Sequence, residues 1–395
     1  MSNKNLIPIT DTKALHTFCD ALAQGDFLCI DTEFHREQTY WPELCLIQAS
    51  APNIEGMIDP LAEGLDLTPF LDLIKDRSRV KVLHAARQDL EIFHALLGEP
   101  LGPIFDTQIG AMALGLGDSI SYDNLIQRVL NLHIDKSSQF TNWLGRPLTE
   151  KQLAYALGDV THLRDAYYEM KMQLEAKGRL GWLAEDMARL EASELYDNRA
   201  EHAWQKLKIR KSKPDYLAVL ANVAAWRETR AKTLNRPRRR IMKDDTIYEI
   251  ALQKPRNEAE YEQLRSLQKG FMRSKYADGL KEMVDQALAS PKQYAPILPT
   301  RKQNAHLPGG VPEMLKVLLK YVSEDASIVP RLIANAADIE RIARGETEDI
   351  PALTGWRYEI FGQHAQALMS GQLALSLQDN EIRLFKTQPD QDAFP

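Results

Sequence analysis

The chain has 395 residues, a formal net charge of −6, 44% hydrophobic residues and 26% charged residues. This balance is typical of a folded soluble protein, and the length predicts two to three domains. No stretch approaches the roughly 20 apolar residues that a transmembrane helix needs, which excludes a membrane-spanning class.

The cysteines and the first residues bear on the compartment. Cys19, Cys29 and Cys45 have no C-x-x-C spacing, so neither a zinc site nor a disulfide framework is indicated. The opening residues MSNKNLIPIT lack the apolar core of a signal peptide. We therefore expect a cytoplasmic protein.

Positive charge is concentrated in the middle of the chain. Residues 201–302 contain 23 Lys and Arg against 12 Asp and Glu, whereas the remaining residues contain 26 against 43. A basic segment between acidic ones indicates a nucleic-acid-binding surface. A solvated helical surface has the same composition and stays open as the alternative.

The first 170 residues alternate between strand-like and helix-like patterns. Four strands are predicted, the first three as neighbours in one meander, at residues 27–33, 44–49, 55–59 and 80–86. Helices are predicted between and after them, at residues 67–76, 88–98 and, following a short strand and an N-cap at Asp106, within 104–115. Strands alternating with helices predict a mixed α/β sheet with helices packed on it.

From about residue 149 the pattern is helical. Thr149 and Gln152 have the spacing of a capping box at the start of a long helix. Further helices are predicted at residues 215–232, 244–252, 258–269, 273–289 and throughout 312–377. The stretch 290–312 contains five prolines and two adjacent glycines and is predicted to be a linker. The resulting domains are 1–200, 205–290 and 312–388, with a linker at 291–311 and a tail at 389–395.

Two carboxylates follow the first strand. Asp31 and Glu33 are two residues apart, so their side chains point to one face of a strand and repel each other. A hard divalent cation such as Mg²⁺, which prefers carboxylate oxygens, would relieve that repulsion. A D-x-E triplet also occurs by chance, so the pair alone is compatible with a solvated strand edge.

Three further residues have positions that suit the same chemistry. Asp89 opens a predicted helix, where the helix dipole also favours an acid. Tyr155 and Asp159 lie one turn apart on a helix face that is otherwise apolar. A carboxylate there needs a partner, such as a tyrosine hydroxyl or a metal. An ordinary core or rim aromatic is the alternative for Tyr155.

Four segments occur in a characteristic order: DTEFHREQTYWPELCLIQ, LHAARQDLEIF, DTQIGA and NWLGRPLTEKQLAYALGDVTHL. Together they resemble the tyrosine branch of the DEDD superfamily of 3′→5′ exonucleases, and most closely the ribonuclease D family, over about residues 20–170. The segment AWRETRAKTLNRPRRRIMKDDTIYEIALQKP resembles an HRDC domain, and residues 355–375 resemble a second, diverged one. The resemblance implies a ribonuclease H-like mixed sheet followed by two all-α HRDC domains. Asn142 stands where the family usually has an acidic residue.

The resemblance also implies a metal site with two divalent ions, Mg²⁺ or Mn²⁺. Asp31 would bridge both ions, Glu33 and Asp159 would hold the ion next to the attacking water, and Asp89 would serve the other. Tyr155 would orient that water by hydrogen bonding, because a tyrosine with a pKa near 10 is a poor general base at neutral pH.

Residues that would contact the substrate are less sharply defined. By the same resemblance, Phe34 would contact the terminal base if the strand bends, and it would otherwise be a core side chain. Arg238, Arg239 and Arg240 form the densest basic run and would either bind phosphates or remain solvated.

The expected activity is metal-dependent 3′→5′ exoribonucleolysis. The substrates would be structured RNA precursors such as tRNA with a free 3′ end, the products nucleoside 5′-monophosphates, and the protein a monomer. A DNA exonuclease and a catalytically silent RNA-binding adaptor are the alternatives.

Overall fold

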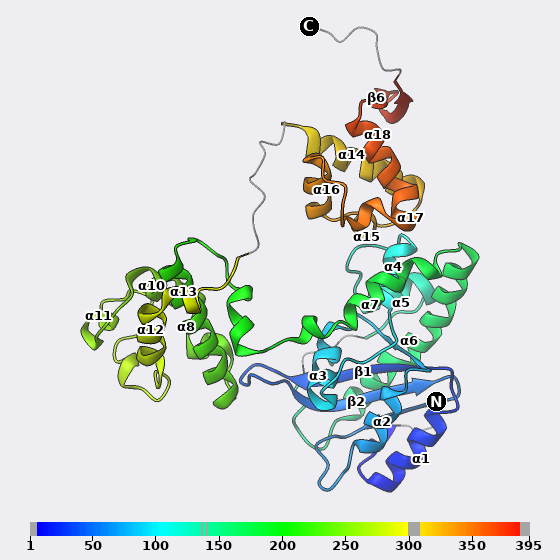
Figure 1. Ribbon diagram of the computed structural model, residues 1–395. Helices are drawn as coiled ribbons and strands as arrows, with labels where there is room; N and C mark the ends of the chain where they lie inside the picture. The colour runs from blue at the N-terminus through cyan, green and yellow to red at the C-terminus, as the bar shows by residue number, and fades with distance from the viewer. Residues whose placement is uncertain (1–5, 136, 140, 299–308, 388–395) are drawn as a thin grey trace. The chain divides into compact units, whose positions relative to one another are not determined.

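The computed structural model describes residues 6–135, 137–139, 141–298 and 309–387, and it divides into two compact units (Figure 1). The first unit comprises Met1–Thr32, Ile47–Ala192 and Arg301–Pro395, and the second comprises Glu33–Leu46 and Ser193–Thr300. The segment between the first two strands therefore groups with the central helices. No helix in the described part of the chain combines the length and the apolar character needed to span a membrane.

A five-stranded mixed sheet forms the centre of the N-terminal fold. Its strands are β1 (Phe27–His35), β2 (Glu43–Ala51), β3 (Ile54–Ile58), β4 (Val80–Leu83) and β5 (Ile104–Asp106). Their spatial order is β3-β2-β1-β4-β5, with β2 and β3 antiparallel and β4 parallel to both β1 and β5. The first three strands are neighbours, as predicted, and the mixed α/β class is confirmed.

The longest helix lies against one face of this sheet. The helices are α1 (Thr12–Leu22), α2 (Thr68–Lys75), α3 (Arg87–Leu97), α4 (Thr107–Ala113), α5 (Tyr122–Leu130), α6 (Glu150–Ala176) and α7 (Ala184–Leu190). The predicted capping box of Thr149 and Gln152 begins α6. The Ser50 hydroxyl donates to the Val160 carbonyl over 2.9 Å, and the Phe27 and Tyr167 rings lie 4.7 Å apart. The Phe27 contact places α6 on the face of β1 that carries its odd-numbered residues, and the Ser50 contact joins α6 to β2.

The turn from β4 into α3 is shorter than predicted. The strand expected through residue 86 ends at Leu83, because Ala85 adopts a left-handed conformation with φ of 52°. The Asp106 carboxylate accepts hydrogen bonds from the Ala85 and Ala86 amides, each over 3.0 Å, and also caps α4 at the Gln108 amide. Asp106 is the predicted N-cap, and it also holds the turn that precedes α3.

The second unit is built from helices around a shared apolar core. They are α8 (Pro214–Thr233), α9 (Arg238–Ile241), α10 (Asp244–Gln253), α11 (Glu258–Glu262), α12 (Leu280–Ala289) and α13 (Pro291–Tyr294). The helix predicted at 273–289 begins only at Leu280, because Gly279 has a φ of 78° that no helix accepts. The helix predicted at 258–269 ends at Glu262. Tyr40, from the segment after β1, is part of this core.

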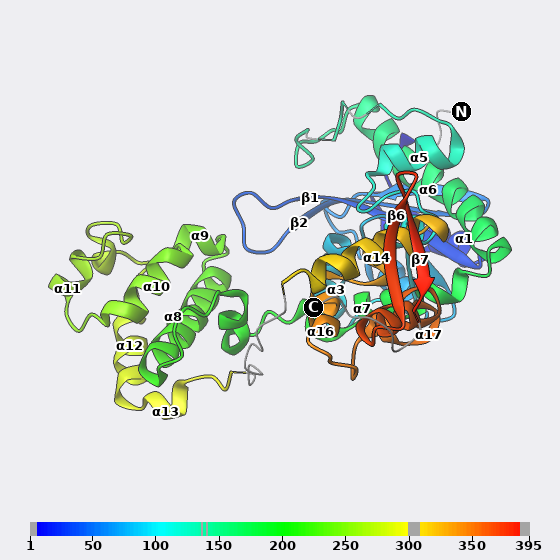
Figure 2. The same ribbon diagram turned by 90° about the horizontal axis from the view of Figure 1, so that it is seen from above.

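The C-terminal part is helical and ends in a hairpin. It contains α14 (Val311–Asp325), α15 (Pro330–Ile333), α16 (Ala336–Ala343), α17 (Gly355–Arg357) and α18 (Gln363–Met369), followed by the antiparallel strands β6 (Leu373–Gln378) and β7 (Glu381–Lys386) (Figure 2). The all-helical prediction for 312–388 is therefore wrong over 373–386. Asp379 and Asn380, with φ values of 51° and 64°, form the two-residue turn that a hairpin requires.

The predicted linker and tail fall partly outside the description. The beginning of the predicted linker 291–311 forms α13, whereas its residues 299–308 lie outside the described residues. The predicted tail 389–395 also lies outside them.

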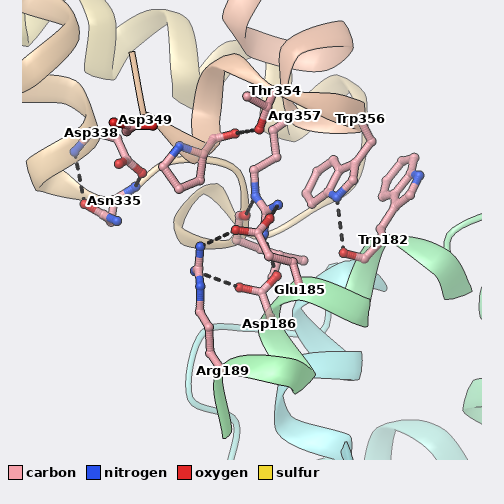
Figure 3. A network of polar contacts seen from close by, with 12 residues as sticks. Trp182, Glu185, Asp186, Arg189, Asn335, Asp338, Asp349, Thr354, Trp356 and Arg357 are labelled. Atoms are coloured by element: carbon pink, nitrogen blue, oxygen red, sulfur yellow. Dashed lines mark hydrogen bonds and ion pairs between the residues drawn. The ribbon is translucent and has the colours of Figure 1, made fainter. Parts of the chain in front are cut away.

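The C-terminal helices are joined to α7 by a polar network (Figure 3). The Arg357 guanidinium lies 2.8 Å from the Glu185 carboxylate and 2.5 Å from that of Asp186, while its side chain is only 5% exposed. Beside it, the indole rings of Trp182 and Trp356 stack at 4.5 Å with an angle of 6°. A buried arginine with two acids and a stacked aromatic pair fixes this junction.

Candidate active site

Three carboxylates gather where β1 meets α6. One oxygen from each of Asp31, Glu33 and Asp159 lies within 4.8 Å of the other two. Strand alternation places Asp31 and Glu33 on the α6 side of β1, where both are half-buried, and α6 supplies the buried Asp159. The cluster offers only carboxylate oxygens, the donor set that suits a hard divalent cation.

Asp159 is held in a low-dielectric position. Its side chain is 7% exposed, and burial raises the pKa of its carboxyl from 3.8 to about 8, while a hydrogen bond from the Tyr155 side chain lowers it in part. The predicted tyrosine partner of this acid is therefore present. Because burial disfavours the charged form, this carboxylate favours a positive charge beside it.

Asp89 is not a member of this three-carboxylate cluster. It lies in the first turn of α3, is 7% exposed, and accepts a hydrogen bond from the Thr32 hydroxyl. Burial raises the pKa of Asp89 to about 6, and the Thr32 hydrogen bond opposes that shift. Thr32 lies between Asp31 and Glu33 in the chain and points to the opposite face of β1.

Two residues near the cluster were missed by the motif analysis. Thr32 connects β1 to Asp89. Tyr122, the first residue of α5, donates its hydroxyl to the Asp159 carbonyl over 2.7 Å. Burial and the nearby acids Asp159 and Asp31 raise the pKa of Tyr122 well above its usual value, so this donor stays protonated. Helix or strand periodicity could predict neither contact, because Thr32 and Asp89 are 57 residues apart and Tyr122 and Asp159 are 37 residues apart.

The predicted substrate-contacting residues are not equivalent. Phe34 lies near the end of β1 and is half-buried. The Arg238 guanidinium forms an ion pair with the buried Glu228 and donates to the Tyr40 hydroxyl over 2.8 Å. Arg239 and Arg240 are exposed. The first arginine of the run therefore packs inward, and the other two face solvent.

Comparisons with known proteins agree with this architecture. A 3′-5′ exonuclease family model matches residues 6–175, and an HRDC domain model matches residues 216–284. The second HRDC domain remains a prediction. The ribonuclease D of Bartonella henselae is 45% identical over 96% of this chain and 94% of its own length. That of Nitrobacter hamburgensis is 44% identical over 95% and 98%.

A solved structure extends the similarity to the fold. Escherichia coli RNase D, described as an exoribonuclease involved in structured RNA processing, superposes with a TM-score of 0.78 at 28% identity, covering 92% of this chain and 98% of that one. Near-complete coverage at more than 40% identity, an exonuclease domain and an HRDC domain all agree with the resemblance seen in the sequence. The chain belongs to the ribonuclease D family of 3′→5′ exoribonucleases.

Proposed function

We propose that the protein trims the 3′ ends of structured RNA precursors, tRNA among them, and releases nucleoside 5′-monophosphates at a centre for two divalent cations. The observation that carries this proposal is the convergence of Asp31, Glu33 and Asp159 oxygens within 4.8 Å. Such a cluster repels itself when it is fully ionised, and cations offset that repulsion.

The roles of the acids are those that the resemblance to the ribonuclease D family implies. Asp31 would be the ligand shared by two cations, and Glu33 and Asp159 would hold the cation beside the attacking water. Asp89, which accepts a hydrogen bond from Thr32, would serve the other cation through the water around it. When bound, the cations lower the pKa of the attacking water and neutralise charge on the scissile phosphate.

Tyr155 and Tyr122 position the reacting groups without exchanging protons. A tyrosine with a pKa near 10 is protonated at neutral pH, so the Tyr155 hydroxyl can donate to Asp159 and accept from the attacking water. Tyr122 holds the backbone of Asp159 through its carbonyl. These contacts orient the attacking water toward the last phosphodiester bond.

The RNA preference rests on family membership and on charge. Ribonuclease D relatives cover nearly the whole chain, and the segment 201–302 has 23 basic against 12 acidic residues. A basic unit neutralises phosphates beyond the terminal nucleotide and releases counterions. The matched exonuclease and HRDC domains lie on one chain, which supports a monomer.

A direct test uses one RNA labelled at either end. An unprocessed tRNA with a 3′ extension is incubated with Mg²⁺ or Mn²⁺, with EDTA as the control and with single-stranded DNA of matched sequence in parallel. The 5′-labelled RNA should shorten one nucleotide at a time, and the 3′-labelled RNA should release labelled mononucleotide at once. Internal fragments, or trimming that persists in EDTA, would contradict the proposal.

A further inference from the structure

Gln48 lies in the middle of β2 and is fully buried, with 0% of its surface exposed. Neither its Oε1 nor its Nε2 atom has a hydrogen-bond partner among the residues that the structure describes. Its neighbours in the strand, Ile47 and Ala49, are buried apolar residues. A buried amide without a partner lowers stability relative to an apolar side chain of the same shape, so packing alone does not account for a glutamine at this position.

The direction of the Gln48 side chain follows from Ser50. Residues two apart in a strand point to the same face of the sheet, and the Ser50 hydroxyl donates to the carbonyl of Val160 in α6. Gln48 therefore points to the α6 side of the sheet. Asp31 points to the same side, and Val160 directly follows Asp159 in α6.

The neighbouring strand places Asp31 beside Gln48. β1 and β2 are adjacent in the sheet (Figure 1), and residues 36–42 between them are fewer than the roughly a dozen that a parallel crossover needs, so the two strands are antiparallel. Burial raises the pKa of the Cys29 thiol, and a hydrogen bond with the Ser50 side chain lowers it in part, so Cys29 and Ser50 are neighbours across this strand pair. The next residues on the same face are Asp31 in β1 and Gln48 in β2.

Asp31 is the polar side chain that can reach the Gln48 amide from the strands on either side. On β3, Gln48 is paired with Met57, whose thioether is at most a weak acceptor. On β1, Cβ atoms that are opposite or diagonal across an antiparallel pair are about 5–8 Å apart, a distance that a glutamine and an aspartate side chain span together. The Asp31 carboxylate belongs to the three-carboxylate cluster.

We propose that Gln48 is a positioning residue of the cation site, and that its amide N–H donates to the Asp31 carboxylate when divalent cations are bound there. This inference rests on the proposed function. Carboxylates that ligate a metal are themselves held by hydrogen bonds, and an ionised carboxylate in a buried position needs donors. The Gln48 amide lowers stability in the metal-free protein, and it fixes the orientation of a cation ligand in the loaded one.

The test uses Gln48→Met and Gln48→Leu, which keep an apolar side chain of similar size and remove the donor. The control is Tyr261→Phe, in the helical core of the second unit. It also removes a fully buried polar atom that has no partner among the described residues. Mn²⁺ binding is measured by isothermal titration calorimetry without RNA, and the unfolding temperature is measured in EDTA.

Gln48→Met should weaken Mn²⁺ binding about 10- to 100-fold, the usual effect of removing a group that orients a metal ligand. Its unfolding temperature in EDTA should equal or exceed that of the wild type, because an unpartnered buried amide is removed. The Mn²⁺ concentration that gives half-maximal RNA trimming should rise by the same factor as the dissociation constant. Tyr261→Phe should leave the Mn²⁺ affinity unchanged.

Two outcomes would overturn the role of Gln48. One is an unchanged Mn²⁺ affinity in the Gln48 variants. The other is a lower unfolding temperature of both variants in EDTA, which would show that the amide already has a partner in the metal-free protein. If the wild type itself binds no Mn²⁺, the proposed cation centre fails, and the role of Gln48 fails with it.

Discussion

The Thr32 hydroxyl donates a hydrogen bond to the carboxylate of Asp89, and this contact links the middle of β1 to the first turn of α3. Thr32 separates Asp31 from Glu33, and its side chain points to the opposite face of the strand. The tripeptide Asp31-Thr32-Glu33 thus directs its two carboxylates toward α6, and its central hydroxyl holds the carboxylate of Asp89. Thr32 therefore positions Asp89.

Replacing Thr32 with valine should lower kcat about 10- to 100-fold, the usual effect of removing a group that orients a metal ligand. The Thr32 hydrogen bond lowers the pKa of Asp89, so its loss raises that pKa further above about 6. The acidic limb of the pH–rate profile should therefore move to higher pH. Thr32→Ser keeps the hydroxyl and should restore both values, while a valine variant with an unshifted profile would contradict this role.

Asp159→Asn should have opposite effects on stability and on activity. Burial disfavours the Asp159 carboxylate and raises its pKa to about 8, so an uncharged amide of similar shape should raise the unfolding temperature of the metal-free protein in EDTA. The same variant loses a cation ligand, and exoribonuclease activity in Mg²⁺ should fall by more than about 100-fold. If Asp159→Asn unfolded at a lower temperature than the wild type in EDTA, the Asp159 carboxylate would not be destabilising in the metal-free protein.

Metal and pH should act on stability together. The folded-state pKa of Asp159 is about 8, against 3.8 for an unperturbed aspartate. Between these values the unfolded chain loses the proton and the folded one retains it, so this group makes the metal-free protein less stable as pH rises from about 4 to 8. Divalent cations bind the deprotonated form, so the metal-induced rise in unfolding temperature should grow across the same interval.

Asp159→Asn is the control for that experiment. In this variant the dependence of the metal effect on pH between 6 and 8 should be much weaker. A wild-type metal effect that is independent of pH would contradict the linkage to Asp159.

Arg357→Ala should destabilise the junction between α7 and the C-terminal helices. Its side chain is 5% exposed and pairs with Glu185 and Asp186. Both acids keep Arg189 as a second partner, so the loss should cost about 1–3 kcal/mol. Denaturant unfolding followed by tryptophan fluorescence reports on this site, because Trp182 and Trp356 stack there.

The control for Arg357 is an exposed arginine of the C-terminal helices that pairs with an acid between α4 and α5. Arg331 pairs with Asp118 at 3.5 Å with its side chain 66% exposed, so Arg331→Ala should change the unfolding free energy by less than about 1 kcal/mol. Similar effects of the two substitutions would show that burial does not govern the junction.

Local periodicity and the family resemblance together made the site predictable. The two-residue repeat of a strand grouped Asp31 with Glu33, and the four-residue spacing of a helix grouped Tyr155 with Asp159. That these pairs belong to one site was implied by the resemblance. The fold class followed from alternating patterns in the same way. None of these inferences needed knowledge of distant contacts.

Contacts between residues far apart in the chain could not be predicted from the sequence. Arg238 is held by Tyr40, 198 residues away, so nothing in the run of arginines distinguished it from its two neighbours. The hairpin at 373–386 was also missed, because its short strands adjoin a helix and depend on the turn at Asp379 and Asn380. The strand predicted through residue 86 ended early because Asp106, 20 residues away, holds the turn through the Ala86 amide.

The most direct test of the central claim is the single-turnover rate at which Asp31→Asn shortens a 5′-labelled RNA in Mg²⁺, with RNA affinity measured on the same preparation. Asp31 belongs to the carboxylate cluster and is not part of the basic segment 201–302. The account predicts a rate reduced by at least about 100-fold with RNA affinity within twofold of the wild type. A variant that trims RNA at the wild-type rate would show that the cluster is not the catalytic centre.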